Sequence, residues 1–576
     1  MPSPATDIHT YAGNGTAGYS GDGGPALSAE FDGTWADADD SNLNVAFPDW
    51  ANSRIRIVAG TSGDWFGTSM TAGDVYTVAG DGTSGYSGNG GPATSAEIDQ
   101  PYAVAFDASG NLLFTDQWNN VIRLVSAVTC TSSCAYGLSS MTPGDIYTIA
   151  GDGYDAGTEY GGYSGDGGPA TSAELYLPTG LAVDKWGNVV FSDASNYRVR
   201  LVAEETCTSG CPYGLSSMTI GDIYTIAGDG TLGYAGNGSA ATSANLDWVT
   251  GVAVDRSGNV VLADLYNNVI RMVAGPGCSS SCPYGLSSIT SGYIYTIAGT
   301  TTAGYSGDGG AATSAEIDWP RGVAVDSSGN VVFADTNNDV IRAIAESTGT
   351  YYGVAMTSGD IYTIACDGTA GYSGDGGPAV SATLNHPIGV ATDSFGQVFV
   401  TDSNNYVVRD FGGGPQGPLS VYPQGSALGD DQFGEASGPQ PACACTKADP
   451  VNLATGDYSD TVTDLSIPDA GIPLQFTRTY DAVAAQQEEQ TASTAPPLGY
   501  GWADNLGMSV SYNSTSGIAT VTEANGALIT FQNYGVDASE PAWCPSDATS
   551  AVFCPTAPRY LATLSETSGI YTYVED

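Results

Sequence analysis

The sequence predicts an all-β protein that begins with a six-bladed β-propeller and continues into a smaller β-rich domain. The first observation is a motif repeated six times, whose YTxAG tyrosine falls at Tyr11, Tyr76, Tyr147, Tyr224, Tyr295 and Tyr362. The second is that each copy holds four strand-like segments separated by glycine-containing turns. A short unit repeated in this way buries its apolar surface only against its neighbours, which is the arrangement of propeller blades.

Each copy has the same order of segments. A GVAVD-like first strand, as at residues 251–255, is followed by a DxxGN turn and a VVFAD-like second strand. A VIRLVA-like third strand and an IYTIAG-like fourth strand follow. Glycine supplies the backbone freedom that the DxxGN turn requires. The first copy has Leu43 at this glycine position, so we expect its turn to be distorted.

The two ends of the repeated region predict how the ring closes. The chain begins with a fourth-strand segment, residues 8–13, and the last copy stops after a third strand, residues 407–411. We therefore expect the N-terminal strand to complete the last blade, which leaves no open sheet edge.

Three polar residues recur in every copy: an Asp that ends the second strand, an Asn three residues later and an Arg seven residues later. They would form either a ring of charges for binding or, inside each blade, a turn-capping Asn and an ion-paired Arg. Recurrence in every copy favours the structural role. The D-x-x-N-x-x-[IV]-R pattern over residues 8–411 resembles the NHL repeat, and this resemblance also implies a six-bladed propeller.

Two sets of residues on one predicted face are candidates for a site. The SGDGG loops between blades contain Asp22, Asp166, Asp308 and Asp375. Glycine-flanked aspartates can bind calcium, but the ligand ladder of a calcium loop is missing, so we favour plain turns and keep calcium as the one possible cofactor. Just before each first strand, at the predicted channel mouth, the copies differ: Gln100, Leu177, Trp248, Trp319 and His386.

Of these mouth residues, Trp248, Trp319 and His386 are the candidate binding residues. Aromatic side chains at a concave mouth would stack on a sugar or hold a peptide, or would simply fill the channel. The chain has only two histidines and lacks G-x-S-x-G, H-E-x-x-H and phosphate-loop motifs, so we assign no catalytic residues.

The cysteines predict disulfides and an oxidising compartment. Three C-x3-C pairs recur in separate copies, which favours local disulfides over zinc. A further pair is expected near the C-terminus, and Cys366 is left over. The predicted disulfide cysteines are Cys130 and Cys134, Cys207 and Cys211, Cys278 and Cys282, and Cys544 and Cys554.

Charge and hydropathy limit the partners. Fourteen Lys and Arg against 62 Asp and Glu give a net charge of −48, which disfavours binding to nucleic acid. No apolar run is long enough to span a membrane. No signal peptide is visible at the N-terminus. We nevertheless expect an extracellular or cell-surface protein, because of the cysteines.

Beyond the propeller (residues 1–411) we predict a Gly/Pro-rich linker, 412–442, and a second β domain, 443–576. The segments DPVNLATGDYSDTVTDLSIP, GIPLQFTRTY and GYGW resemble the N-terminal region of RHS (YD-repeat) proteins. A propeller before such a region is similar in order to teneurins and to bacterial RHS surface proteins or toxins.

Three functions are compatible with this order. We favour a non-catalytic extracellular module whose propeller binds a protein or a glycan. The alternatives are a calcium-dependent propeller enzyme of the lyase or lactonase kind, and the front part of a toxin-delivery protein.

Overall fold

In the computed structural model the chain forms two compact units, Met1–Leu428 and Gly429–Asp576. The structure describes residues 7–412 except 41, 154–160, 281 and 394, and in the second unit the backbone of ten strands. The predicted linker, apart from Gly412, lies outside the described residues.

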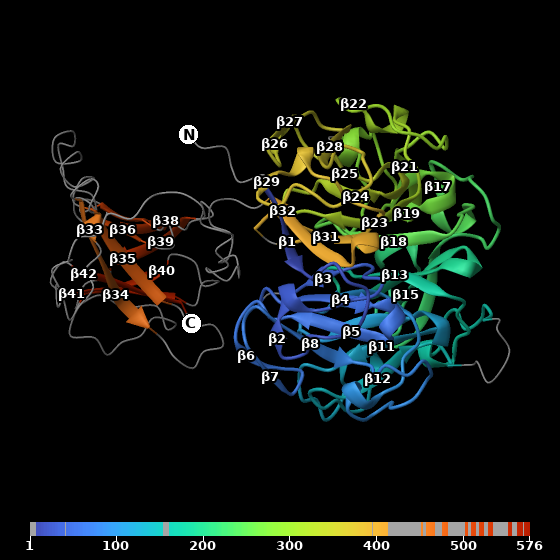
Figure 1. Cartoon of the computed structure of the whole chain (residues 1–576), viewed down its shortest axis with the longest axis horizontal. Coiled ribbons are helices and arrows are strands. Elements are labelled where there is room, and N and C mark those ends of the chain that lie inside the picture. Colours follow the sequence, from blue (N-terminus) through green and yellow to red (C-terminus); the bar gives the residue numbers. More distant parts are fainter. Residues whose placement is uncertain are drawn as a thin grey trace, which may run out of the picture. The chain divides into compact units, whose positions relative to one another are not determined.

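The first unit is a six-bladed β-propeller, as predicted (Figure 1). Each blade is an antiparallel sheet whose four main strands follow one another from the axis outwards. Blade 1 is β3 (Ala38–Asp39), β4 (Val45–Asp49), β5 (Arg54–Val58) and β8 (Asp74–Ala79); blade 2 is β9 (Pro101–Phe106), β10 (Leu112–Asp116), β11 (Val121–Val125) and β12 (Ile146–Ala150); blade 3 is β13 (Pro178–Val183), β14 (Val189–Asp193), β15 (Arg198–Val202) and β16 (Ile223–Ala227).

The remaining blades repeat this order. Blade 4 is β18 (Val249–Val254), β19 (Val260–Asp264), β20 (Val269–Val273) and β21 (Tyr293–Ala298); blade 5 is β23 (Pro320–Val325), β24 (Val331–Asp335), β25 (Val340–Ile344) and β28 (Asp360–Ala365); blade 6 is β30 (Pro387–Thr392), β31 (Gln397–Asp402), β32 (Val407–Gly412) and β1 (Asp7–Ala12).

The N-terminal strand closes the ring, which confirms the predicted closure. Strand β1 pairs antiparallel with β32, with His9 opposite Asp410 and Thr10 opposite Arg409. The first and last blades are also joined near the axis, where the Ser403 hydroxyl donates a hydrogen bond of 2.6 Å to the carbonyl oxygen of Thr34. The ring therefore has no unpaired edge at its seam.

Short elements complete the propeller. Two-residue strands extend four blades at the outer edge: β2 (Gly24–Pro25), β17 (Ser239–Ala240), β22 (Gly310–Ala311) and β29 (Gly377–Pro378). Hairpins join the third and fourth strands of blades 1 and 5: β6 (Gly63–Trp65) with β7 (Thr68–Met70), and β26 (Gly349–Tyr351) with β27 (Val354–Met356). Every helical element among the described residues is a three-residue 3-10 turn. One, such as η10 (Leu265–Asn267), follows the second strand of each blade.

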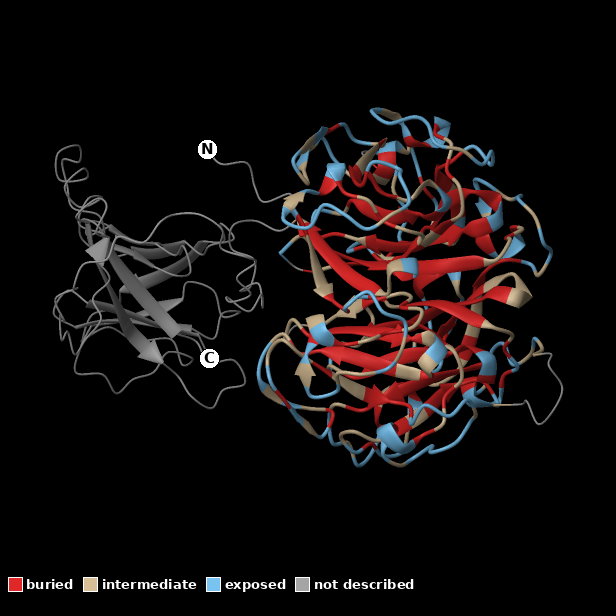
Figure 2. Ribbon diagram, viewed as in Figure 1, coloured by how far each residue is buried: buried red, intermediate tan, exposed pale blue. Residues whose placement is uncertain are grey.

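The core lies between the blades. The second and third strands are almost wholly buried (Figure 2). Their apolar side chains lie on both faces of each sheet and pack against those of the adjacent blades. Leu113 of blade 2, for example, belongs to the same buried cluster as Phe191 of blade 3. This packing of neighbour against neighbour is what the repeat predicts.

The expected distortion of the first turn is wrong. Leu43 adopts the left-handed conformation (φ 65°) that Gly110 has in the next blade (φ 79°). The turn keeps the same hydrogen bonds, since the Leu43 amide donates to the Asp40 carbonyl at 3.0 Å as Gly110 does to Asp107 at 2.9 Å. The irregularity lies instead in the inner strand, β3, which has only two residues.

The second unit is also β-structured. One sheet is formed by β33 (Val451–Asn452), β34 (Asp457–Ser466), β35 (Gln475–Asp481) and β36 (Trp502–Asp504). A six-stranded antiparallel meander is formed by β37 (Ser509–Asn513), β38 (Ile518–Thr522), β39 (Leu528–Asn533), β40 (Ala551–Pro555), β41 (Ala562–Thr567) and β42 (Ile570–Glu575). The predicted Cys544–Cys554 disulfide lies outside the residues whose side chains are described.

Candidate functional site

The recurring Asp, Asn and Arg of each blade form a buried structural network, which confirms their predicted role. In blade 5 the Arg342 guanidinium donates to Asp335 Oδ2 at 3.2 Å, and Asn338 donates to Asp335 Oδ1 at 2.8 Å. Both members of this ion pair are fully buried. Blades 1 to 4 repeat the pair, and in blade 6 Arg409 pairs instead with Asp375. The six buried arginines are Arg56, Arg123, Arg200, Arg271, Arg342 and Arg409.

The aspartates of the SGDGG loops belong to the same network. Asp308, for example, accepts from Arg342 at 2.6 Å and from the Thr363 amide at 3.1 Å. The same arginine pairing holds for all four candidate calcium ligands: Asp22, Asp166, Asp308 and Asp375. Each of these four carboxylates thus forms an ion pair with an arginine of a different blade. Among the residues that the structure describes, no three His, Cys, Asp or Glu are grouped as a metal site would require.

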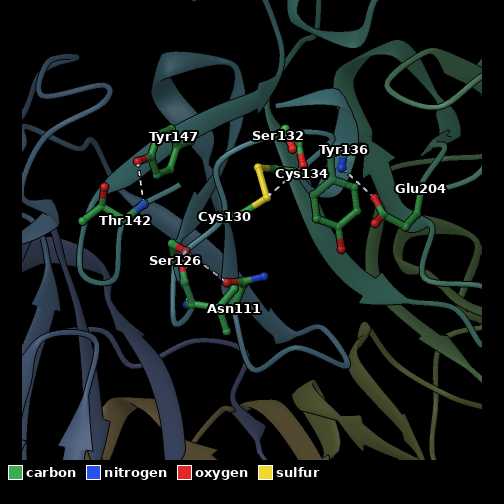
Figure 3. Close-up of a disulfide and its surroundings, with 10 residues drawn as sticks. Asn111, Ser126, Cys130, Ser132, Cys134, Tyr136, Thr142, Tyr147 and Glu204 are labelled. Atoms are coloured by element: carbon green, nitrogen blue, oxygen red, sulfur yellow. Dashed lines mark hydrogen bonds between the residues drawn. A yellow bond between two sulfur atoms is a disulfide. The ribbon is translucent and has the colours of Figure 1, made fainter. Parts of the chain in front are cut away.

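Three of the predicted disulfides form: Cys130–Cys134, Cys207–Cys211 and Cys278–Cys282. The first of them stabilises a loop that places a tyrosine against the next blade. In this loop the buried Tyr136 donates its backbone N–H to Glu204 at 2.6 Å (Figure 3). The disulfide therefore serves a contact between blades. Cys366 is a free, buried thiol.

The mouth residues, one before each inner strand, share an unusual backbone. Gln100, Leu177, Trp248, Trp319 and His386 all have φ between 48° and 58°, in the left-handed region, and the equivalent in the first blade is Gly33 (φ 74°). A side chain in this conformation costs about 1–2 kcal/mol. The residue that ends each second-strand turn, for example Asn268, has the same left-handed conformation.

The preceding blade holds several of these residues in place. The Trp319 amide donates to Asn268 Oδ1 at 3.0 Å and the His386 amide donates to Asp339 Oδ1 at 2.7 Å. Both acceptors lie at the end of a 3-10 turn of the previous blade. The mouth side chains are therefore fixed from two blades at once, and each is half-buried.

The two tryptophans lie on one aromatic surface, which we call the aromatic ladder: Trp248, Tyr266 and Trp319. The Tyr266 ring centroid is 6.5 Å from that of Trp248 and 5.7 Å from that of Trp319, the latter edge-to-face. Tyr266 lies in the turn after β19 and is 49% exposed. The turns after the second strands and the mouth positions thus share one face, as the strand order predicted.

An arginine lies beside this ladder. The Arg321 guanidinium carbon is 5.7 Å from the ring centroid of Trp319 and 5.4 Å from that of Trp35. Burial lowers the pKa of His386, and the charge of Arg321 lowers it further. Burial raises the pKa of Tyr102, and Arg321 partly offsets this rise. Arg321 thus faces residues from blades 1, 2, 5 and 6.

Sequence reasoning missed Arg321, Tyr266, Trp35 and Tyr102. A signal existed for three of them. Two residues after the mouth position the copies carry Trp35, Tyr102, Thr179, Thr250, Arg321 and Ile388, and this is the second position at which the repeats differ strongly. Tyr266 has no such signal, because the turn in which it lies varies in every copy.

Comparison with known proteins agrees with the predicted order of parts. Residues 448–531 match the family model described as Domain of unknown function (DUF6531). Human Teneurin-4 is 27% identical over 271 residues, which are 42% of this chain and 8% of that protein. The chain therefore matches only a small part of its curated relatives.

Solved structures show further similarities. A structural genomics protein of unknown function from Bacteroides thetaiotaomicron has 14% identity and a TM-score of 0.45, covering 70% of this chain and 75% of the other. Virginiamycin B lyase from Staphylococcus aureus has 11% identity and a TM-score of 0.32, covering 66% and 84%.

No helix among the described residues has the length and apolarity needed to cross a membrane. The chain thus combines a six-bladed propeller with a DUF6531 region and is related in sequence to teneurins.

Proposed function

We propose that this chain is a non-catalytic, extracellular interaction module that binds a protein or glycan partner through the mouth of its propeller. The observation that carries the proposal is the set of side chains at the mouth. Five of six copies hold a large side chain in a strained left-handed conformation, and two of these, Trp248 and Trp319, join the half-exposed Tyr266 in one ladder. Rigid aromatic residues beside an arginine are the side chains that most often dominate binding energy.

The mouth side chains are only half-buried, so part of each is open to a partner. Extracellular location is supported by the three disulfides, which persist in oxidising compartments, and by the sequence relation to teneurins.

The test is the variant Trp248→Ala/Trp319→Ala, made in the full chain and applied to arrays of glycans and of extracellular proteins. We expect the native chain to bind at least one ligand class and the variant to lose that binding at least tenfold. Trp186→Ala is the matched control, because Trp186 lies in a DxxGN turn on the opposite face and packs on Tyr213.

Unchanged binding by the double variant would contradict the proposal, and so would equal loss in the Trp186 control. A bound ligand that the native chain converts to a product would favour the enzyme alternative instead.

A further inference from the structure

We infer that the ligand of the mouth is an acidic saccharide: Arg321 binds the carboxylate of a single acidic sugar while Trp319 and Trp248 stack on sugar rings. The inference rests on the proposed function and adds the chemical class of the ligand. It follows from one cation that forms no ion pair with a carboxylate of the described residues, from the tyrosine hydroxyl beside it and from the neighbouring aromatic ladder.

Arg321 differs from the buried arginines of the blades. The nine ion pairs of the described residues use six arginines, and Arg321 is not among them: Arg56, Arg123, Arg200, Arg271, Arg342 and Arg409. Its Nε, like theirs, is buried without a hydrogen-bond partner among the described residues, but no carboxylate there neutralises its charge. In a chain with 62 acidic residues and a net charge of −48, such a half-buried guanidinium is a position prepared for an anion from outside.

The hydroxyl of Tyr102 lies beside Arg321. Tyr102 is only 4% exposed; burial raises its pKa, and the charge of Arg321 together with a side-chain hydrogen bond to it acts to lower the pKa of the tyrosine. A carboxylate bound by Arg321 would therefore also lie near a hydroxyl group that can donate to it.

The neighbouring aromatic rings favour a sugar over an acidic peptide. An Asp or Glu side chain would satisfy Arg321 but would leave the ladder without a partner. A hexuronic acid carries a carboxylate and an apolar C–H ring face in one unit, which suits a guanidinium 5.7 Å from the Trp319 ring. A long polyanion is disfavoured by the charge of −48, so the ligand carries its acid singly or at one end.

The test compares two oligosaccharides that differ at one carbon: one ends in β-glucuronic acid and the other in β-glucose. Titration calorimetry with the full chain should show at least tenfold tighter binding of the acidic probe. Arg321→Gln should bring the two affinities within about twofold of each other. Trp319→Ala should weaken both probes. Arg256→Gln, an exposed arginine in a DxxGN turn, is the charge-matched control and should bind as the native chain does.

Other outcomes overturn the inference. Equal affinity of the native chain for the two probes would remove the role of the carboxylate but leave glycan binding at the mouth intact. Binding of a peptide ending in Glu, with neither saccharide bound, would remove the sugar and leave the interaction role intact. If the native chain binds none of these three probes, the inference fails. If Arg321→Gln keeps the acidic preference, the assignment of Arg321 fails; near-ultraviolet circular dichroism checks that each variant is folded.

Discussion

Replacing a buried blade arginine should destabilise the propeller strongly, and Arg271→Met is the cleanest case. Arg271 is fully buried; it donates to Asp264 Oδ2 at 3.4 Å and to the carbonyl oxygens of Asn245 and Ala235 at 2.8 and 2.9 Å. Its blade has Asn237 in place of the second aspartate, so Asp264 is its one ion-pair partner among the described residues. Breaking a buried pair from one side costs about 3–5 kcal/mol, because the remaining charge is left without compensation.

The pH dependence of this loss identifies its cause. Burial raises the pKa of Asp264 to about 6 even with the arginine present, and removing the arginine raises it further. At pH 5 the aspartate of the variant is therefore protonated, and the loss of stability should be smaller than at pH 7.5 by roughly 1 kcal/mol. Urea unfolding followed by tryptophan fluorescence measures both values.

Two further variants sharpen the test. Arg271→Met/Asp264→Asn removes both charges, and at pH 7.5 it should be less destabilised than Arg271→Met alone. Arg256→Met changes an exposed arginine and should stay within about 0.5 kcal/mol of the native chain. A loss below about 1 kcal/mol for Arg271→Met would refute the ion-pair explanation. So would a double variant whose loss of stability equals the sum of the losses measured for Arg271→Met and for Asp264→Asn separately.

The remaining predictions concern pH, the first turn and a disulfide. Burial outweighs the neighbouring arginine and raises the pKa of the second-strand aspartates, for example that of Asp116 and that of Asp335 to about 6. The folded chain therefore binds these protons more tightly than the unfolded chain does. The stabilisation that results is complete below about pH 4 and is lost as the pH rises through about 6. The melting temperature should therefore rise from pH 8 to pH 5, and a fall over this range would contradict the assignment. Leu43→Gly should raise the free energy of unfolding by about 0.5–1 kcal/mol in urea titrations, because glycine adopts φ 65° freely; a loss would mean that packing of Leu43 outweighs the strain. Cys207→Ser/Cys211→Ser should cost no more than about 2 kcal/mol, the entropy of so short a loop, and a global loss of folding by circular dichroism would show that the loop does more than join blades.

The architecture could be predicted because it is local and repeated. The spacing of Tyr11 and its five equivalents, the turn glycines and the third-strand end at Phe411 together determine blade number and closure, and β1 pairs with β32 as expected. The distortion predicted for the first turn does not occur, because the turn does not depend on glycine alone. The Asp40 side chain still accepts from the amides of Asn42 and Asn44 at 2.8 and 2.9 Å, which holds the turn in place with leucine at its left-handed position.

The candidate site could be predicted only in part, because it is assembled across the ring. Trp248 and Trp319 can be identified from the sequence, because the residue just before the first strand differs from copy to copy. Arg321 lies in the same strand region, but its importance depends on Trp35, which lies in the first blade, and on the absence of a carboxylate partner among the described residues. Such relations between distant blades leave no local pattern.

Left-handed backbone alone does not distinguish a binding position from a structural one in this repeat. The residue that ends each second-strand turn is left-handed in all six blades without being glycine: Ser53, Asn120, Tyr197, Asn268, Asp339 and Tyr406. At the mouth the first blade has Gly33, and the other five copies carry different side chains, each at a cost of roughly 1 kcal/mol. The proposed site therefore depends on which side chains lie there, above all Trp248 and Trp319 beside Arg321, and not on the strain itself.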